Sequence, residues 1–173
     1  MALAWTRIIV MRRWPIAVVL ITSSLAAPAF AQSLLAKPTI QHASVAGSSS
    51  ATSAAPGGAV TLFVDVAPQP AIHIYAAGAK DFTAVSIVLT PNAAVKAGKP
   101  AYPKPDAAAA PGAADAVPAY TRPFRIAVPV TIGSTAKKGE TVTIAGAVNY
   151  QACDDRLCYP VASAPVTWQV AVR

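Results

Sequence analysis

The chain contains two cysteines, Cys153 and Cys158, with four residues between them. A β-hairpin with such a loop can place two cysteines opposite each other, at the Cα separation of about 4.4–6.8 Å that a disulfide requires. A pair of this kind can exchange its disulfide with the thiols of another protein. It can equally be an inert crosslink, and the spacing alone favours neither interpretation.

The residues around the cysteines have opposing effects on thiolate formation. Asp154 and Asp155 disfavour a nearby thiolate, whereas Arg156 favours one. We therefore expect a passive carrier, oxidised or reduced when a partner with a more reactive thiol docks on it. Tyr150 and Tyr159 flank the pair. They are candidate supporting residues that shield it from small oxidants, although both also fit ordinary packing on a strand.

The ring that the two cysteines would close is small. In the chain-entropy model it stabilises the fold by roughly 2 kcal/mol, less than a bridge that closes a long loop. A chain of 173 residues can bury a core without such crosslinks. The pair is therefore not obviously needed for folding, which makes a functional role worth considering.

Alternation of apolar and polar residues predicts that strands position the pair. The predicted strands are 41–46, 59–67, 72–75, 83–90, 124–132, 141–150 and 165–172. Pro129 suggests that its strand lies at an edge or contains a bulge, and Trp168 is expected in the core. About seven or eight strands with turn signals and no convincing helix predict an all-β fold, an immunoglobulin-like antiparallel β-sandwich.

Two segments are expected to be irregular. Residues 47–58 are rich in Ser, Ala and Gly and predict a flexible loop. Residues 99–123 contain six prolines, which exclude a continuous ladder or helix. We expect a long, mobile excursion there, with a strand fragment near Tyr102.

The N-terminus has the pattern of a secretory signal peptide. A basic segment precedes the short apolar run Ile16–Leu25, and Ala29 and Ala31 are the small residues that a signal peptidase reads. Cleavage is expected between Ala31 and Gln32. The alternative, a membrane anchor, is disfavoured because spanning a bilayer takes about 20 apolar residues.

The sequence therefore predicts three regions: a signal peptide at 1–31, a flexible leader with a possible first strand at 32–57, and one domain at 58–173. Export places the protein in an oxidising compartment, where cysteines can form disulfides. No later apolar run of about 18 residues or more occurs, so we expect no membrane span after signal cleavage.

Composition and motifs disfavour several other functions. The net charge of +7 is spread out, without a basic cluster interleaved with aromatics, so nucleic-acid binding is not supported. His42 and His73 are the two histidines, and their spacing from the cysteines is not a metal-site pattern; His73 is expected to be a packing or surface residue. No hydrolase constellation stands out. We expect no metal and no cofactor.

The cysteines lie in a motif that resembles a known family. Residues Val148–Cys153 (VNYQAC) followed by Leu157–Pro160 (LCYP) resemble the signature of the N-terminal periplasmic domain of the thiol:disulfide interchange protein DsbD. Residues Ile72–Tyr75 are similar to the family's His-x-Tyr strand, and Phe124–Ile132 to the strand before its penultimate turn. The resemblance extends over about residues 58–172.

The resemblance implies an immunoglobulin-like fold in which Cys153 and Cys158 cycle between dithiol and disulfide. In that family the domain takes electrons from a membrane-embedded domain through a thioredoxin-like domain. It passes them to periplasmic proteins such as disulfide isomerases and cytochrome c maturation factors. The second cysteine usually forms the interprotein bond, which favours Cys158.

Two departures from the family pattern shape the expected partners. The sequence ends at Arg173, so we expect a separate membrane reductase and periplasmic thioredoxin-like or disulfide isomerase-type partners. The domain would be an accessory part of a protein-disulfide reductase system. The family's aromatic cap loop corresponds to residues 102–120, where Tyr102 or Tyr120 would have to replace the missing aromatic cluster. The alternative function is a non-catalytic immunoglobulin-like binding module with a structural disulfide.

Overall fold

The computed structural model describes residues 41–173; the predicted signal peptide and its cleavage site after Ala31 lie outside the described residues. The described part contains twelve strands and no helix, and nothing between residues 41 and 173 forms a helix that could cross a bilayer. The strands are β1 Ala43–Ser49, β2 Ser53–Ala54, β3 Ala59–Pro68, β4 His73–Tyr75, β5 Ser86–Leu89, β6 Val95–Ala97, β7 Asp106–Ala108, β8 Val117–Tyr120, β9 Phe124–Ile132, β10 Thr141–Tyr150, β11 Ala152–Cys153 and β12 Ala162–Val172.

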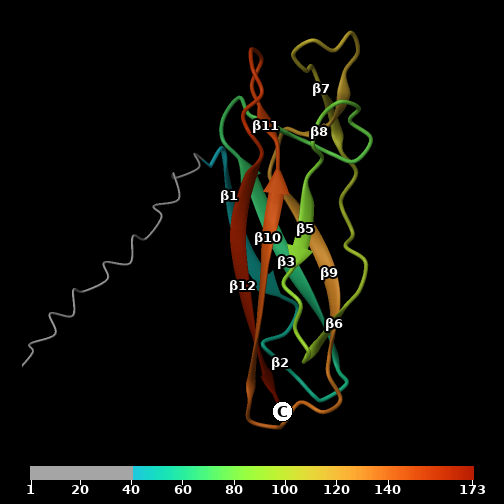
Figure 1. The fold of residues 1–173 in the computed structure, drawn as a ribbon, viewed down its shortest axis with the longest axis vertical. Helices are drawn as coiled ribbons and strands as arrows, with labels where there is room; N and C mark the ends of the chain where they lie inside the picture. Colours follow the sequence, from blue (N-terminus) through green and yellow to red (C-terminus); the bar gives the residue numbers. More distant parts are fainter. Residues whose placement is uncertain (1–40) are drawn as a thin grey trace, which may run out of the picture. The chain divides into compact units, whose positions relative to one another are not determined.

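These strands form three four-stranded sheets, in the orders β1-β3-β9-β6, β2-β12-β10-β5 and β11-β4-β8-β7. The ladders are antiparallel except for the short pairing of β2 with β12. The long strands of the first two sheets run along the sandwich, while β7, β8 and β11 gather at the end away from the C-terminus (Figure 1). The predicted all-β, immunoglobulin-like antiparallel sandwich is confirmed.

Strict alternation along the long strands builds the core between the two large sheets. In β3 the apolar residues at every second position are buried, and β12 alternates in the same way along its whole length. Trp168 is 4% exposed, and its Nε1 donates to the carbonyl oxygen of Phe63 over 3.1 Å. Because side chains on a strand alternate between faces, this pattern fixes which face of each sheet points inward.

The segment expected to be a flexible loop, 47–58, is partly strand. Strand β1 runs on to Ser49, which pairs with Leu62 of β3, and β2 follows at Ser53–Ala54. A Cβ at Gly47 would lie 2.7 Å from Cγ2 of Val166. Gly47 therefore permits close approach of β1 to β12, which is a packing role for glycine.

The proline-rich segment 99–123 contains two paired strands, β7 and β8, instead of a fully irregular excursion. Pro118 fits into β8 because its carbonyl accepts a hydrogen bond from Ala76. The carbonyl and the absent N–H of one residue point to the same side of a strand, so the ladder with β7 loses no donor. Instead of a strand at Tyr102 there is an isolated bridge between Ala101 and Ala127.

Pro129 lies in β9, which has neighbours on both sides, and the register between β9 and β3 is unbroken. The prediction of an edge strand or a bulge is therefore wrong. The carbonyl of Pro129 accepts a bond from Gly98, directly after the end of β6. The missing N–H thus faces a position where the β6 ladder has ended.

Candidate functional site

Cys153 and Cys158 form a disulfide across a tight hairpin at the end of the sandwich. Their Cα atoms are 4.1 Å apart, slightly closer than the expected lower limit of about 4.4 Å. Strand β11 carries Cys153 and pairs with β4. In this antiparallel ladder, Cys153 lies opposite His73. The N–H of Asp154 donates to the carbonyl of Leu157, which closes the loop. The two cysteines therefore face each other in a hairpin, as predicted, with a Cα separation just below the predicted range.

Asp154 organises this loop through both of its carboxylate oxygens. Its Oδ1 accepts the backbone N–H groups of Arg156 and Leu157, each at 2.8 Å, and its Oδ2 accepts the hydroxyl of Tyr159 at 2.7 Å. These bonds, led by that of Leu157, lower the pKa of Asp154 from 3.8 to about 2. The carboxylate therefore holds the loop in one conformation at neutral pH.

The two cysteine residues differ in their exposure to solvent. Cys153 is fully buried, whereas Cys158 is partly exposed. Leu157 and Val161, on either side of Cys158 in the sequence, are apolar and about half exposed, at 48% and 49%. Cys158 is therefore the more accessible of the two cysteines, and exposed apolar residues lie near it in the sequence.

A small hydrophobic cluster, separate from the main core, covers the disulfide. Its fully packed members are Tyr75, Ala110, Ala119 and Cys153, and Ala79, Phe82, Ala108, Val117 and Cys158 pack against it. The ring of Phe82 stacks on that of Tyr75 with 4.1 Å between centroids. The cover is thus built from the β4–β5 loop and the β7–β8 hairpin.

The two predicted supporting tyrosines lie outside this cluster. Tyr150 is buried in the main core, where its hydroxyl donates to Oε1 of Gln41 over 2.8 Å. Tyr159 packs against the main core and stacks on His42, with 3.7 Å between ring centroids. Tyr159 remains linked to the disulfide loop through its hydrogen bond to Asp154.

The tyrosines that were candidates for a cap are also engaged elsewhere. The hydroxyl of Tyr102 accepts the N–H of Ile87, and that of Tyr120 donates to the carbonyl of Pro103. The segment 102–120 nevertheless covers the cysteines, through the small side chains of β7, β8 and the turn between them.

Tyr75 and Phe82 are the aromatic residues that sequence reasoning missed. Tyr75 belongs to the segment 72–75 that carried part of the family resemblance, so a signal for it existed. Phe82 stands in a loop and follows no strand alternation, and only the fold shows that it reaches the site.

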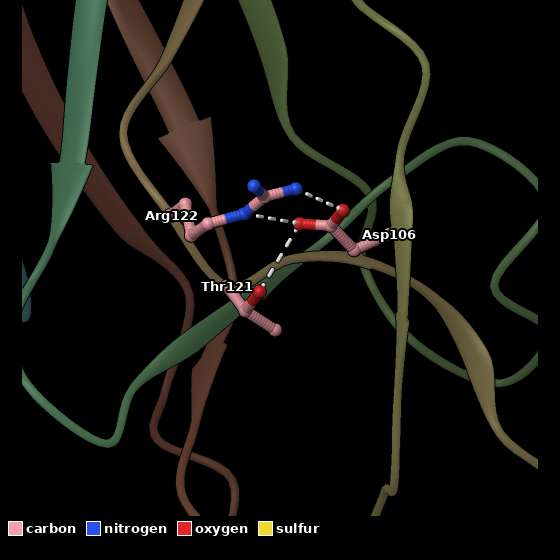
Figure 2. A network of polar contacts seen from close by, with 3 residues as sticks. All are labelled: Asp106, Thr121 and Arg122. Atoms are coloured by element: carbon pink, nitrogen blue, oxygen red, sulfur yellow. Dashed lines mark hydrogen bonds and ion pairs between the residues drawn. The ribbon is translucent and has the colours of Figure 1, made fainter.

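The base of the β7–β8 hairpin is held by a polar network (Figure 2). Arg122 Nη2 lies 2.7 Å from Oδ1 of Asp106, and Thr121 Oγ1 donates to Oδ2 of Asp106 over 3.1 Å. The bonds from Arg122 and Thr121 lower the pKa of Asp106. The network ties the start of β7 to the residues after β8, and so positions the small side chains of the cover.

His73 is the buried polar side chain of the site, with 7% exposure. Its Nε2 lies 3.3 Å from the hydroxyl of Tyr75, which in turn lies 3.5 Å from Sγ of Cys158. The expectation of a packing role for His73 is confirmed. Between residues 41 and 173, no group of three or more His, Cys, Asp or Glu side chains is placed to hold a metal ion.

Residues 42–168 match the family described as the N-terminal domain of the thiol:disulfide interchange protein DsbD. Comparison with curated proteins gave no significant match. Among solved structures, the chain is similar to the N-terminal periplasmic domain of ScsB from Proteus mirabilis, with 15% identity and a TM-score of 0.50 over 75% of this chain. The alignment covers only 47% of that solved chain.

A second similar structure is the DsbD N-terminal domain of Neisseria meningitidis in the reduced form, with 15% identity and a TM-score of 0.45. That alignment covers 71% of this chain and 82% of the other. The family match spans well over half of the sequence. The chain therefore belongs to the family of DsbD N-terminal domains.

Proposed function

We propose that the protein is a periplasmic thiol–disulfide exchange module, in which Cys153 and Cys158 carry reducing equivalents to or from partner proteins. The observation that carries this proposal is the unequal burial of the two bonded cysteines, because Cys153 is fully buried and Cys158 is partly exposed. A purely structural crosslink needs no such asymmetry. Family membership supports the same chemistry.

The exchange proceeds through Cys158. A partner thiolate attacks Sγ of Cys158, the Cys153–Cys158 bond breaks, and Cys153 leaves as a thiolate. The second cysteine of the partner then attacks the sulfur of the first partner cysteine in the mixed disulfide. This releases Cys158 as a thiolate. The domain gains two electrons as a dithiol and the partner becomes a disulfide; the reverse sequence passes those electrons on.

The apolar residues Leu157 and Val161 suit the docking of a protein partner. Exposed apolar side chains beside a reactive sulfur contribute binding area without adding charge to the site. The expected partners are periplasmic thioredoxin-like or disulfide isomerase-type proteins, including cytochrome c maturation factors, and a separate membrane reductase. In this setting the domain is an accessory part of a protein-disulfide reductase system, exported by the signal peptide at 1–31.

The reduction potential of the Cys153–Cys158 pair tests this function. We expect a value near about −200 mV, measured by equilibration of the purified mature domain with glutathione buffers and mass spectrometry of the trapped thiols. A value well below about −300 mV would mark a structural bond. The domain would then be a non-catalytic immunoglobulin-like binding module.

A further inference from the structure

Three side chains form a line of hydrogen bonds that ends at the reactive sulfur. His73 Nε2 is 3.3 Å from the hydroxyl of Tyr75, and this hydroxyl is 3.5 Å from Sγ of Cys158. His73 and Tyr75 both belong to β4, which pairs with β11 on one side and β8 on the other. The sheet ladder therefore positions His73 and Tyr75, and the isolated bridge between Cys153 and Cys158 holds the third group beside them.

The chemistry of the disulfide fixes the direction of these bonds. Sγ of Cys158 is bonded to Cys153 and carries no hydrogen, so Tyr75 must be the donor. The Tyr75 oxygen then accepts from His73, which requires a hydrogen on Nε2 of the imidazole. Two donors in series thus point at the sulfur.

We propose, building on the exchange function above, that Tyr75 is a catalytic residue that stabilises the thiolate of Cys158, and that His73 is a positioning residue that orients its hydroxyl. A hydrogen bond to an ionised acceptor is stronger than one to a neutral acceptor. The contact therefore strengthens when Cys158 becomes a thiolate. This makes Cys158 the attacking sulfur when the reduced domain donates electrons.

In that step the Cys158 thiolate attacks a disulfide of the partner protein. A bond forms between Cys158 and one partner sulfur, and the other partner sulfur leaves as a thiolate. Cys153, deprotonated in turn, attacks Sγ of Cys158, restores the intramolecular disulfide and releases the second partner sulfur. The domain loses two electrons, the partner disulfide becomes a dithiol, and the two protons lost by the domain match those that the partner gains.

The electrostatics of the site agree with a neutral relay. Burial lowers the pKa of His73, and the charge of Asp154, in the loop after β11, opposes this shift. Burial raises the pKa of Tyr75, so its hydroxyl stays protonated at neutral pH. Tyr75, on the same strand, and Asp154, in the loop after β11, are the titratable groups that interact with His73.

Alkylation of Cys158 by iodoacetamide as a function of pH tests the relay, in mature protein carrying Cys153→Ala. We expect Tyr75→Phe to raise the pKa of Cys158 by about one and to slow alkylation at pH 7 about tenfold. Tyr102→Phe, which removes a hydroxyl outside the cluster, is the control and should leave the profile unchanged. An unchanged profile in folded Tyr75→Phe protein would overturn the proposal.

Two variants of His73 separate positioning from packing. His73→Leu removes the donor and should shift the pH profile of Cys158 alkylation in the same direction as Tyr75→Phe. His73→Gln keeps an N–H near the position of Nε2, so its alkylation profile should stay close to that of the protein with His73. Equal shifts in both would contradict the relay, and the pair serves as the test if Tyr75→Phe does not fold. The alkylation assay needs no partner protein, so it tests the relay independently of the exchange function. If the alkylation profiles support the relay but the reduction potential of the Cys153–Cys158 pair lies below about −300 mV, the exchange function is rejected and the relay is not.

Discussion

The hydroxyl of Tyr159 donates to Oδ2 of Asp154 over 2.7 Å, so the residue after Cys158 is tied to the residue after Cys153. The other oxygen of Asp154 accepts two backbone N–H groups of the intervening loop. The disulfide is therefore flanked by a second, non-covalent closure of the same hairpin. Because hydrogen bonds to an ionised acceptor are the stronger ones, this closure is strongest while Asp154 is ionised.

The pKa of Asp154 gives a dependence of stability on pH. It is lowered from 3.8 to about 2 in the folded protein, so the ionised group contributes stability that is complete above about pH 4 and is lost as the pH falls through about 2. We expect Asp154→Asn to remove this part of the decrease in Tm between pH 4 and pH 2, measured by circular dichroism. Asp155→Asn, in the same loop, is the control. If Tm of the Asp154→Asn variant depends on pH in the same way as Tm of the parent protein, the closure does not stabilise the fold.

The sandwich and the hairpin that carries the cysteines could both be predicted from the sequence. Alternation along 59–67 and 124–132 is a property of each strand alone, and each segment forms a strand with the predicted face buried. The spacing of Cys153 and Cys158 likewise depends only on local chain geometry.

The cover of the site could not be predicted in the same way. Phe82 reaches Tyr75 from a loop, and Ala108 and Ala110 carry no signal beyond their small size. The prolines of 99–123 suggested an irregular segment, because the side of the strand that Pro118 faces is decided by its neighbours in the sheet. Such features depend on contacts between segments far apart in the sequence.

The unequal burial of the cysteines predicts which one binds a partner. We expect the Cys153→Ala variant, in which Cys158 is a free thiol, to form a mixed disulfide with a thioredoxin-like protein whose first cysteine carries a thiol leaving group. Cys158→Ala should react at least about tenfold more slowly, because Cys153 is fully buried. Non-reducing electrophoresis after timed quenching measures both rates. Equal rates would show that the hairpin opens before exchange, so that burial in the folded state does not select the sulfur.

The apolar surface beside Cys158 predicts a partner-specific effect. Leu157→Asp should slow exchange with a thioredoxin-like protein about fivefold or more, corresponding to about 1 kcal/mol of lost docking energy. Reduction by dithiothreitol, which needs no docking surface, should change much less. Val88→Asp is the matched control, because Val88 is 56% exposed and lies on β5, outside the cysteine hairpin. A similar loss in both variants would point to a general effect of charge.

The stack of Phe82 on Tyr75 predicts that one loop residue limits access to the disulfide. The rings lie 4.1 Å apart between centroids, and Phe82, like Cys158, packs against the cluster that contains Cys153. Phe82→Ala should lower the free energy of unfolding by about 1–2 kcal/mol, since a stacked pair and its buried area are lost. It should also raise the rate of disulfide reduction by dithiothreitol several-fold, because local opening over Cys158 becomes easier.

Phe63→Ala provides the comparison for this effect. Phe63, on β3, is also partly exposed, but its ring packs under Arg125 of β9 and is not part of the cluster at the cysteines. The Phe63→Ala variant should lower stability. Its rate of disulfide reduction by dithiothreitol should equal that of the parent protein when each is measured the same number of degrees below its own Tm. If both variants accelerate reduction to the same extent, the rate follows global unfolding and Phe82 is not a cover. If only Phe82→Ala does so, the aromatic shield of this domain is supplied by the β4–β5 loop.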